Sequence, residues 1–281
     1  MSRKVGNGVI EAERNEALIT WHQAAGRDLP WRHTNDPHQI LVSEVMLQQT
    51  QVDRVVPYFE RFIDRYPTVP ALAAAGLRDV LAEWSGLGYN SRAQRLHQAA
   101  RDIERQGWPK DVHGLMQLPG VGIYTARAIA CFAFGSSAIP VDTNIRRVLN
   151  RWHGTELSDK LLGDTAGADR LSTPAANWTQ AVMDLGATCC RPRAPGCGSC
   201  PGAAWCSGPE TYLAPPRQSP FEGSARQVRG AVVRELLSGP TSAEALHQAT
   251  GFSSRSIEAA LTALAAEQLV HAASDTYRLP D

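Results

Sequence analysis

Residues 118–144 read LPGVGIYTARAIACFAFGSSAIPVDTN, and this stretch decides the fold. Gly120 and Gly122 lie between the apolar end of one helical pattern and the apolar start of the next. Because glycine permits a positive φ and a close approach of the backbone, we predict a tight turn between two short helices. The second helix is apolar on nearly all sides and is predicted to be buried. Its first turn offers unpaired backbone N–H groups to a phosphate.

The same stretch contains Asp142, which precedes the helical run TNIRRVLNRW. Aspartate is a favoured N-cap, and the dipole of the following helix is expected to keep its carboxylate ionised. A Gly-x-Gly turn alone is a weak signal, since most such turns bind nothing. The carboxylate strengthens it, and we predict that a phosphate-binding hairpin and a fixed carboxylate lie close together.

The segment LPGVGIYTARAI followed by VDTN resembles the helix-hairpin-helix and Gly/Pro-Asp motif of the base-excision DNA glycosylases related to endonuclease III. The resemblance implies an all-α fold with DNA bound across the cleft between two domains. In that fold Gly120 and Gly122 belong to the hairpin that binds the DNA backbone.

The length and charge of the chain limit the number of domains and the partners that it can have. At 281 residues the chain is long enough for two or three domains. Its 28 Lys and Arg residues balance its 28 Asp and Glu residues, so the overall charge neither supports nor excludes DNA binding. The first residues contain no apolar signal-peptide core, and no apolar run is long enough to span a bilayer. We therefore expect a cytoplasmic protein that meets no membrane and associates with the nucleoid through DNA.

Five of the six cysteines lie between positions 189 and 206. Disulfide frameworks are rare in cytosolic chains, whereas four thiolates this close together can converge on one metal centre. Zinc is one alternative, because structural four-cysteine zinc sites are common. The spacing of six, two and five residues resembles the [4Fe-4S] cluster loop of the endonuclease III family, with the ligands Cys190, Cys197, Cys200 and Cys206. Cys131 and Cys189 fall outside this pattern and are expected to be small buried hydrophobes.

Two groups of arginines are candidates for contacts to DNA phosphates. Arg191 and Arg193 lie inside the cysteine loop, where a metal centre would hold their backbone rigid and let them present positive charge to a phosphate. Arg146, Arg147 and Arg151 follow the predicted N-cap. For these three, a solvated helix face and phosphate contacts both remain open.

A third feature is Glu44, in the run ILVSEVMLQQTQVDRVVPYFERF, which predicts a helix over residues 40–62. On a helical wheel Val42, Val45 and Met46 share an arc with Leu41, and Glu44 lies at its edge, between Leu41 and Leu47. Partial desolvation would raise the pKa of this carboxyl and suit it to general-acid chemistry near neutral pH. A solvated helix glutamate is the alternative on pattern alone.

The segments LPWR, SEVMLQQTQV and GLGYNSRAQRLHQAA narrow the resemblance to the adenine DNA glycosylases, which remove adenine mispaired with 8-oxoguanine. This implies that Glu44 is the acid at the purine ring and that Asp142 is the carboxylate beneath the sugar. Tyr124 and Asn144 match residues that support that carboxylate. Bifunctional relatives have lysine where this chain has Tyr124, so the resemblance implies a monofunctional enzyme.

The same resemblance assigns residues to the DNA contact. It places an adenine pocket at Arg27 and Trp31, with Asp184 near it, and contacts to the lesion-bearing strand at Gln49, Thr50, Leu87 and Tyr89. Leu87 and Tyr89 lie on a glycine-rich loop from which apolar side chains can wedge into a base stack. The alternatives are a polar helix face for Gln49 and Thr50 and a core position for Leu87. Asn90 departs from the commoner tyrosine.

The chain divides into three parts in the fold that the resemblance implies. They are an iron-sulfur domain of residues 1–28 and 141–213, a six-helix domain of residues 29–140, and a C-terminal module of residues 214–281. We expect helices over 10–25 and 176–188, two more within 68–103, and a proline-rich linker over 212–223. The module has three helical patterns (225–237, 243–250 and 254–267) and two short strands (269–272 and 276–279), an order that resembles a winged helix.

The module is a departure from the family, since many adenine glycosylases carry a Nudix-like lesion-reading domain there. Between positions 222 and 281 it holds five arginines against seven acidic residues. A DNA-reading module would be basic, so we expect this one to pack on the rest of the chain or to bind a protein partner.

The sequence thus predicts a monomeric adenine DNA glycosylase-like enzyme acting on double-stranded DNA with a mispaired adenine. A thymine or uracil mismatch glycosylase of the same fold is the nearest alternative. A non-catalytic iron-sulfur protein that binds DNA through the hairpin alone, and a zinc-stabilised regulator built on the winged helix, also remain open.

Overall fold

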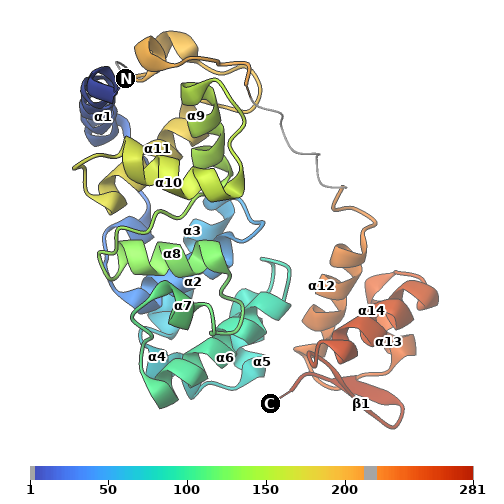
Figure 1. Cartoon of the computed structure of the whole chain (residues 1–281). Coiled ribbons are helices and arrows are strands. Elements are labelled where there is room, and N and C mark those ends of the chain that lie inside the picture. Colours follow the sequence, from blue (N-terminus) through green and yellow to red (C-terminus); the bar gives the residue numbers. More distant parts are fainter. Residues whose placement is uncertain (1–3, 212–219, 281) are drawn as a thin grey trace. The chain divides into compact units, whose positions relative to one another are not determined.

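In a computed structural model of the chain, residues 4–211 and 220–280 are described, and they are almost entirely helical (Figure 1). The all-α prediction is confirmed. The α-helices are α1 (Lys4–Ala25), α2 (Pro37–Leu47), α3 (Val52–Arg65), α4 (Val69–Ala73), α5 (Leu77–Trp84), α6 (Ser91–Gln106), α7 (Val112–Leu115), α8 (Ile123–Phe132), α9 (Thr143–His153), α10 (Asp159–Asp169), α11 (Ala175–Thr188), α12 (Ala225–Leu236), α13 (Ala243–Thr250) and α14 (Ser254–Ala266). Short 3₁₀ turns lie at Pro30–Arg32, Cys197–Ser199 and Ala203–Trp205.

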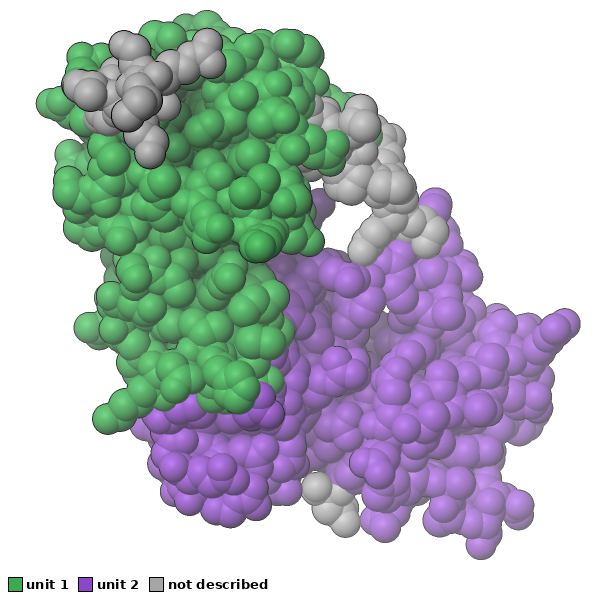
Figure 2. Space-filling view, viewed as in Figure 1, with its two compact units in different colours: residues 1–40, 110–116, 122–216 green, residues 41–109, 117–121, 217–281 purple. Residues whose placement is uncertain are grey.

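The chain forms two compact units, coloured separately in Figure 2. Unit 1 comprises residues 1–40, 110–116 and 122–216, and unit 2 comprises residues 41–109, 117–121 and 217–281. The three-part division expected from the sequence stays a prediction. Its last boundary and most of the expected linker, residues 212–219, lie outside the described residues. No described helix is both long and apolar enough to cross a membrane.

Unit 1 is built on the packing of α11 against α9 and α1. Trp178 is fully buried at its centre, among side chains such as Leu18, Ile145 and Leu185. The indole N–H of Trp178 donates to Oδ1 of Asn15 at 3.0 Å, so burial leaves this polar group satisfied. Four cysteines from the C-terminal side of α11 pack against the same core. The core therefore supports the start of the cysteine loop.

Unit 2 contains α2 to α6 around a second core, in which the rings of Phe62 and Trp84 meet edge to face at 6.0 Å. The prediction of one helix over residues 40–62 is wrong, because α2 ends at Leu47 and α3 begins at Val52. Gln49 lies between them with a left-handed φ of 57°. The segment 68–103 likewise forms three helices instead of two, since the chain turns at residues 74–76 between α4 and α5.

The break after α2 has a tertiary cause. The buried guanidinium of Arg92, from α6, donates to the carbonyl oxygens of Val45, Met46 and Gln48 at 2.7–2.8 Å. These are carbonyls that the last turn of a helix cannot pair internally. Arg92 thus caps α2 from outside, which no local sequence signal near residue 47 indicates.

The predicted hairpin is confirmed: α7 and α8 are joined by a tight turn over residues 116–122. Gly120 has a φ of 78°, whereas Gly122 has a φ of −85° and is the N-cap of α8. The need for a positive φ therefore applies to Gly120 alone. Helix α8 is buried over Thr125–Ala126 and Ala128–Cys131, as its apolar composition predicts.

The C-terminal module has the predicted three helices and hairpin. Its strands, β1 (His271–Ala273) and β2 (Thr276–Arg278), pair antiparallel with Ala272 opposite Tyr277. Helix α14 packs against α12 and α13, with Val232, Leu246 and Leu264 buried between them. The order of these elements agrees with the predicted winged-helix-like module.

Candidate functional site

Asp142 is the N-cap of α9, as predicted, and both of its carboxylate oxygens are engaged. Oδ1 accepts the backbone N–H of Ile145 at 2.7 Å, and Oδ2 accepts Nδ2 of Asn144 at 2.8 Å. Asn144 thus supports the carboxylate, which is the role that its sequence position implies. Two hydrogen bonds fix the direction in which the carboxylate points.

The pKa of Asp142 differs from the expectation based on the helix dipole. Burial raises the pKa of this carboxyl above the usual value, and the hydrogen bonds from Ile145 and Asn144 and the charge of Arg147 lower it by less. The helix dipole alone, from which we expected a readily ionised group, does not decide the outcome. A carboxylate in this position is less hydrated and is ready to be stabilised by a nearby positive charge.

Arg147 links this carboxylate to the cysteine loop. Its Nη2 donates to Oδ1 of Asn144 and to the carbonyl oxygen of Gly186, both at 2.6 Å, and its Nε donates to the carbonyl oxygen of Cys190 at 2.6 Å. The residue is only 2% exposed. The sequence left open a solvated helix face or a phosphate contact, and neither fits Arg147. No local pattern predicts its buried contacts.

Arg151 also faces the cysteines. It is buried, and its Nη1 lies 3.2 Å from Sγ of Cys190 and donates to the carbonyl oxygen of Arg191 at 2.8 Å. Arg146, by contrast, pairs with the exposed carboxylate of Asp159. The three arginines therefore have different roles, and two of them organise the cysteine loop.

The cysteine loop surrounds a cavity of about 90 Å³. Its lining contains Cys189 and all four predicted ligands, Cys190, Cys197, Cys200 and Cys206, together with Trp152 and Arg151. Burial raises the pKa of Cys200 to about 11, and the neighbouring thiols add to this rise. Within the described residues, no three Cys, His, Asp or Glu side chains stand close enough together to bind a single metal ion.

Three further predicted site residues lie in unit 1, in two different segments. Tyr124 lies half-buried in the first turn of α8, and Arg191 and Arg193 are exposed on the cysteine loop. Their predicted roles toward DNA and toward Asp142 stay predictions.

Asp184 is fully buried in α11 and accepts hydrogen bonds from two side chains and one backbone N–H. Oδ1 accepts Nε of Arg27 at 2.6 Å and Nη2 of Arg32 at 2.8 Å, while Oδ2 accepts the Arg27 backbone N–H and Nη1 of Arg32. The ring Nε2 of His22 lies 3.2 Å from Oδ2. Trp31 lies half-buried in the adjoining 3₁₀ turn. The structure therefore brings Arg27 and Asp184 together, and it adds Arg32 and His22, which the sequence analysis did not single out.

These contacts set the charges of the Asp184 cluster. Burial on its own raises the pKa of Asp184, but the hydrogen bonds and charges of Arg32 and Arg27 outweigh it, so the pKa is lowered. Burial also lowers the pKa of His22. The cluster is therefore an ionised carboxylate between two guanidiniums with a histidine that favours its neutral form.

Glu44 lies in the middle of α2, and its side chain is 7% exposed. The alternative of a solvated glutamate is therefore excluded. Leu41, Val42, Val45 and Met46 are buried around it, as the helical wheel predicts. A carboxyl in these surroundings is largely removed from water, which is what a general acid near neutral pH requires.

Two loops of unit 2 carry the predicted lesion-strand residues. Gln49, which is exposed, and Thr50 lie in the turn after α2, so the helix-face alternative is wrong for both. Tyr89 lies half-exposed in the loop between α5 and α6. Leu87, at 5% exposed, packs inward, so the expectation that it is exposed on this loop is wrong and its burial favours the core alternative. Its predicted DNA contact stays untested.

Arg92 joins these two loops. Besides capping α2, it donates through Nη2 to Oγ1 of Thr50 at 3.1 Å and to the carbonyl oxygen of Gly88 at 3.0 Å. Its guanidinium lies 5.5 Å from the centre of the Tyr89 ring. Burial lowers the pKa of Arg92 to about 10, which leaves the group charged at neutral pH.

Substitutions at the two hairpin glycines should separate folding from DNA binding. A Cβ at Gly120 would lie 2.9 Å from Cβ of Arg95, and φ there is left-handed, so Gly120→Ala should cost roughly 1–2 kcal/mol in the free energy of unfolding. Gly122→Ala meets no atom within 4 Å and its φ of −85° suits alanine, so it should lower the unfolding temperature less than Gly120→Ala while binding duplex more weakly. Thermal unfolding and duplex titration measure the two effects. Equal unfolding temperatures for the two variants would contradict this account.

Comparison with known proteins shows the family to which the chain belongs. The model of the HhH-GPD superfamily of base excision DNA repair proteins matches residues 42–162, which include Glu44, Tyr89, the hairpin and Asp142. The adenine DNA glycosylase of Mycolicibacterium smegmatis is 44% identical over 235 residues, a match that covers 80% of each chain.

Solved structures agree. A thermostable thymine-DNA glycosylase superposes with a TM-score of 0.68 at 30% identity and covers 73% of this chain and 98% of its own. A trapped endonuclease III–DNA covalent intermediate has a TM-score of 0.62 at 24% identity, covers 75% of this chain and 98% of its own, and supports the fold alone. The chain therefore belongs to the HhH-GPD superfamily of base excision DNA repair proteins and, within it, to the adenine DNA glycosylases.

Proposed function

We propose that this enzyme removes adenine mispaired with 8-oxoguanine or guanine by hydrolysing the N-glycosidic bond. The observation that carries the proposal is the carboxylate of Asp142, held by Ile145 and Asn144 and partly removed from water. Cleavage of a glycosidic bond passes through an oxocarbenium-like sugar and needs one carboxylate beside that cation and one acid on the leaving group.

Each carboxyl group has one task in this mechanism. Glu44, buried in α2, donates a proton to the adenine ring, so that the base leaves as a neutral molecule. Asp142 stabilises the positive charge at C1′ until water attacks, either by charge alone or through a transient ester. The hydrogen bonds to Asp142 prevent the carboxylate from rotating away from the cation.

Monofunctional action is part of the proposal. A lyase step needs an amine that forms a Schiff base with the sugar, and the hairpin position offers the phenol of Tyr124 instead. Borohydride should therefore trap no stable enzyme–DNA adduct. A trapped adduct on a lysine would contradict monofunctional action and leave adenine excision standing.

The base pocket follows from the Asp184 cluster. Arg27 and Arg32 are fixed on Asp184, and Trp31 lies between them in the sequence and offers an aromatic face. A flipped adenine would stack on such a face and accept hydrogen bonds from neighbouring donors. Asp184 acts there as a positioning residue for the arginines.

A panel of three duplexes tests the function. Single-turnover base release is measured with A:8-oxoguanine, A:G and T:G mispairs, and adenine release from the first two with none from T:G is the expected result. The second candidate is a thymine mismatch glycosylase, which the likeness to a thymine-DNA glycosylase favours. Thymine release alone would establish that candidate. Tight binding with no abasic product would instead establish a non-catalytic DNA-binding protein.

A [4Fe-4S] cluster is the cofactor that best fits the cysteine loop. Four thiolates in a tetrahedral zinc site lie only about 3.8 Å apart, because each Zn–S bond is about 2.3 Å long. The cavity lined by these cysteines fits a larger group better. Cys190, Cys197, Cys200 and Cys206 would hold it, and it would stiffen the loop that carries Arg191 and Arg193.

Cys200→Ser should therefore remove the cluster. We expect about four iron and four sulfide per parental chain, loss of both in the variant, and weaker duplex binding at the same salt concentration. Cys189→Ser is the matched control, because Cys189 also lines the cavity but falls outside the spacing. If the parental protein contained zinc and no sulfide, the site would be a zinc site and the cluster proposal would be wrong.

Double-stranded DNA would be the partner of this proposed enzyme. The enzyme would act as a monomer and would associate with the nucleoid through this DNA. The half-exposed Tyr89 and the exposed Gln49 would contact the strand opposite the adenine. Whether the C-terminal module also binds a protein is tested by measuring the mass of the complex that full-length chain forms in cell extract.

A further inference from the structure

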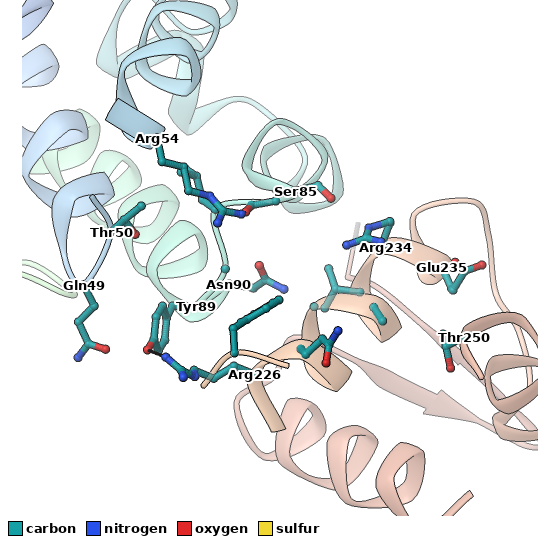
Figure 3. A pocket seen from close by; sticks show the side chains of 18 of the residues that line it. Gln49, Thr50, Arg54, Ser85, Tyr89, Asn90, Arg226, Arg234, Glu235 and Thr250 are labelled. Carbon is teal, nitrogen blue, oxygen red and sulfur yellow. Dashed lines mark hydrogen bonds between the residues drawn. The ribbon is translucent and has the colours of Figure 1, made fainter. Parts of the chain in front are cut away.

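A groove of about 760 Å³ lies within unit 2, with one wall from the loops after α2 and α5 and the other from the C-terminal module (Figure 3). The first wall includes Gln49, Thr50 and Tyr89, and the second includes Phe221 and Arg226. A volume of this size is within the range that small-molecule sites occupy. The module therefore borders the residues predicted to meet the lesion-bearing strand.

Tyr89 occupies an unusual backbone conformation on this wall. Its φ is 51°, in the left-handed region, and it follows Gly86 and Gly88, which also have positive φ values. Such a conformation is strained for a non-glycine residue and persists only when surrounding contacts hold it. The contacts of Tyr89 therefore decide how firmly the loop presents this side chain.

Two guanidiniums supply those contacts. Arg92 lies 5.5 Å from the centre of the Tyr89 ring and is itself fixed on backbone carbonyls of unit 2. Arg226, at the start of α12, lies 5.9 Å from the ring centre and donates through Nη1 to the phenol oxygen at 2.8 Å. Figure 3 shows the Tyr89 and Arg226 side chains meeting at their tips. Only the second contact comes from the module.

The contact of Arg226 with Tyr89 is one of several contacts between the module and the rest of unit 2. Nη2 of Arg78 donates to the carbonyl oxygen of Leu237 at 2.6 Å. Nε2 of Gln94 donates to the carbonyl oxygen of Gln268 at 3.3 Å. These bonds join the C-terminal ends of α12 and α14 to α5 and α6.

We propose that Arg226 is a positioning residue for Tyr89, so that the C-terminal module sets how the tyrosine is presented to the base stack. The proposal rests on the proposed function, in which Tyr89 wedges beside the purine opposite the adenine. It gives the acidic module a part in recognising the mispair without a basic DNA-binding face. One hydrogen bond carries the effect, so its loss should change wedge insertion by roughly three- to tenfold.

The test is a double-mutant cycle on the full-length chain. Arg226→Ala, Tyr89→Phe and the double variant are compared by single-turnover adenine release and by the fluorescence of 2-aminopurine placed beside 8-oxoguanine, which rises when a wedge unstacks it. Each single variant should lower the fluorescence rise and the rate three- to tenfold. The double variant should match the singles, because both substitutions delete the same bond.

Arg255→Ala is the control, because this exposed arginine of α14 removes the same charge from the module without lining the groove. An Arg226→Ala variant that behaves like Arg255→Ala, or single effects that multiply in the double variant, would overturn the proposal. Failure of the proposed function is distinct: the parental chain would then release no adenine, whereas the fluorescence cycle could still be measured on bound duplex.

Discussion

Asp142→Asn should lower the single-turnover rate of adenine release by about 10²- to 10⁴-fold while the protein still binds a mispaired duplex. Asparagine can keep the N-cap bond from Ile145, but it has no charge to set against the sugar cation. Glu44→Gln should cause a loss of similar size, because it keeps the shape of the acid and removes its proton. Quench-flow or gel assays of base release measure both rates.

Asp159→Asn is the matched control, since its exposed carboxylate also lies beside α9 and pairs only with Arg146 at the surface. Its rate should equal the parental rate. The pH profile adds a second check: because burial raises the pKa of Asp142, the acid side of the rate profile should lie at a higher pH than the titration of a solvated aspartate. A parental rate in Asp142→Asn or in Glu44→Gln would contradict the catalytic role assigned to that carboxyl group.

Asp184→Ala should lower the free energy of unfolding by about 3–5 kcal/mol, the largest stability effect that we expect. Asp184 is 0% exposed, and its removal leaves the partly buried Arg27 and Arg32 without their shared carboxylate. Denaturant unfolding measures the loss. Asp102→Ala is the control, because Asp102 pairs with the largely exposed Arg105 and should cost less than about 1 kcal/mol.

The stability contribution of Asp184 should depend on pH in a defined direction. Its pKa is lowered in the folded state, so the stabilisation is fully present above the unfolded value of about 3.9. It is lost as the pH falls through the lower folded value. The difference between the parental chain and Asp184→Asn should therefore shrink below about pH 4, and a difference that grows with acid would contradict the cluster's assigned charges.

Local signals account for what the sequence predicted correctly. The glycines of the hairpin, the N-cap Asp142 and the capped helices of the module each depend on residues within one or two turns. The apolar neighbours of Glu44 on the same helix indicate its desolvation but leave a solvated glutamate open, and the structure decides between the two. The family resemblance then supplied the roles of these residues.

Contacts between distant segments account for what the sequence analysis missed. The helix over 40–62 breaks because Arg92, more than 40 residues away, binds the carbonyls at its middle. The sequence pattern around Arg147 and Arg151 is typical of a charged helix face. In the structure both are buried against the cysteine loop. A pattern of residue types gives no sign of these partners, because an arginine fixed on backbone oxygens and one in water have the same local sequence.

The many acceptors of Arg92 have an evolutionary consequence. One guanidinium serves the end of α2, the hydroxyl of Thr50 and the carbonyl of Gly88, and only arginine presents enough donors in a planar fork for all of them. An insertion or deletion in either loop would pull one set of acceptors off this fork. The two loops should therefore change length only together across descendants of this chain, and lysine should be disfavoured at position 92 even where the charge is kept.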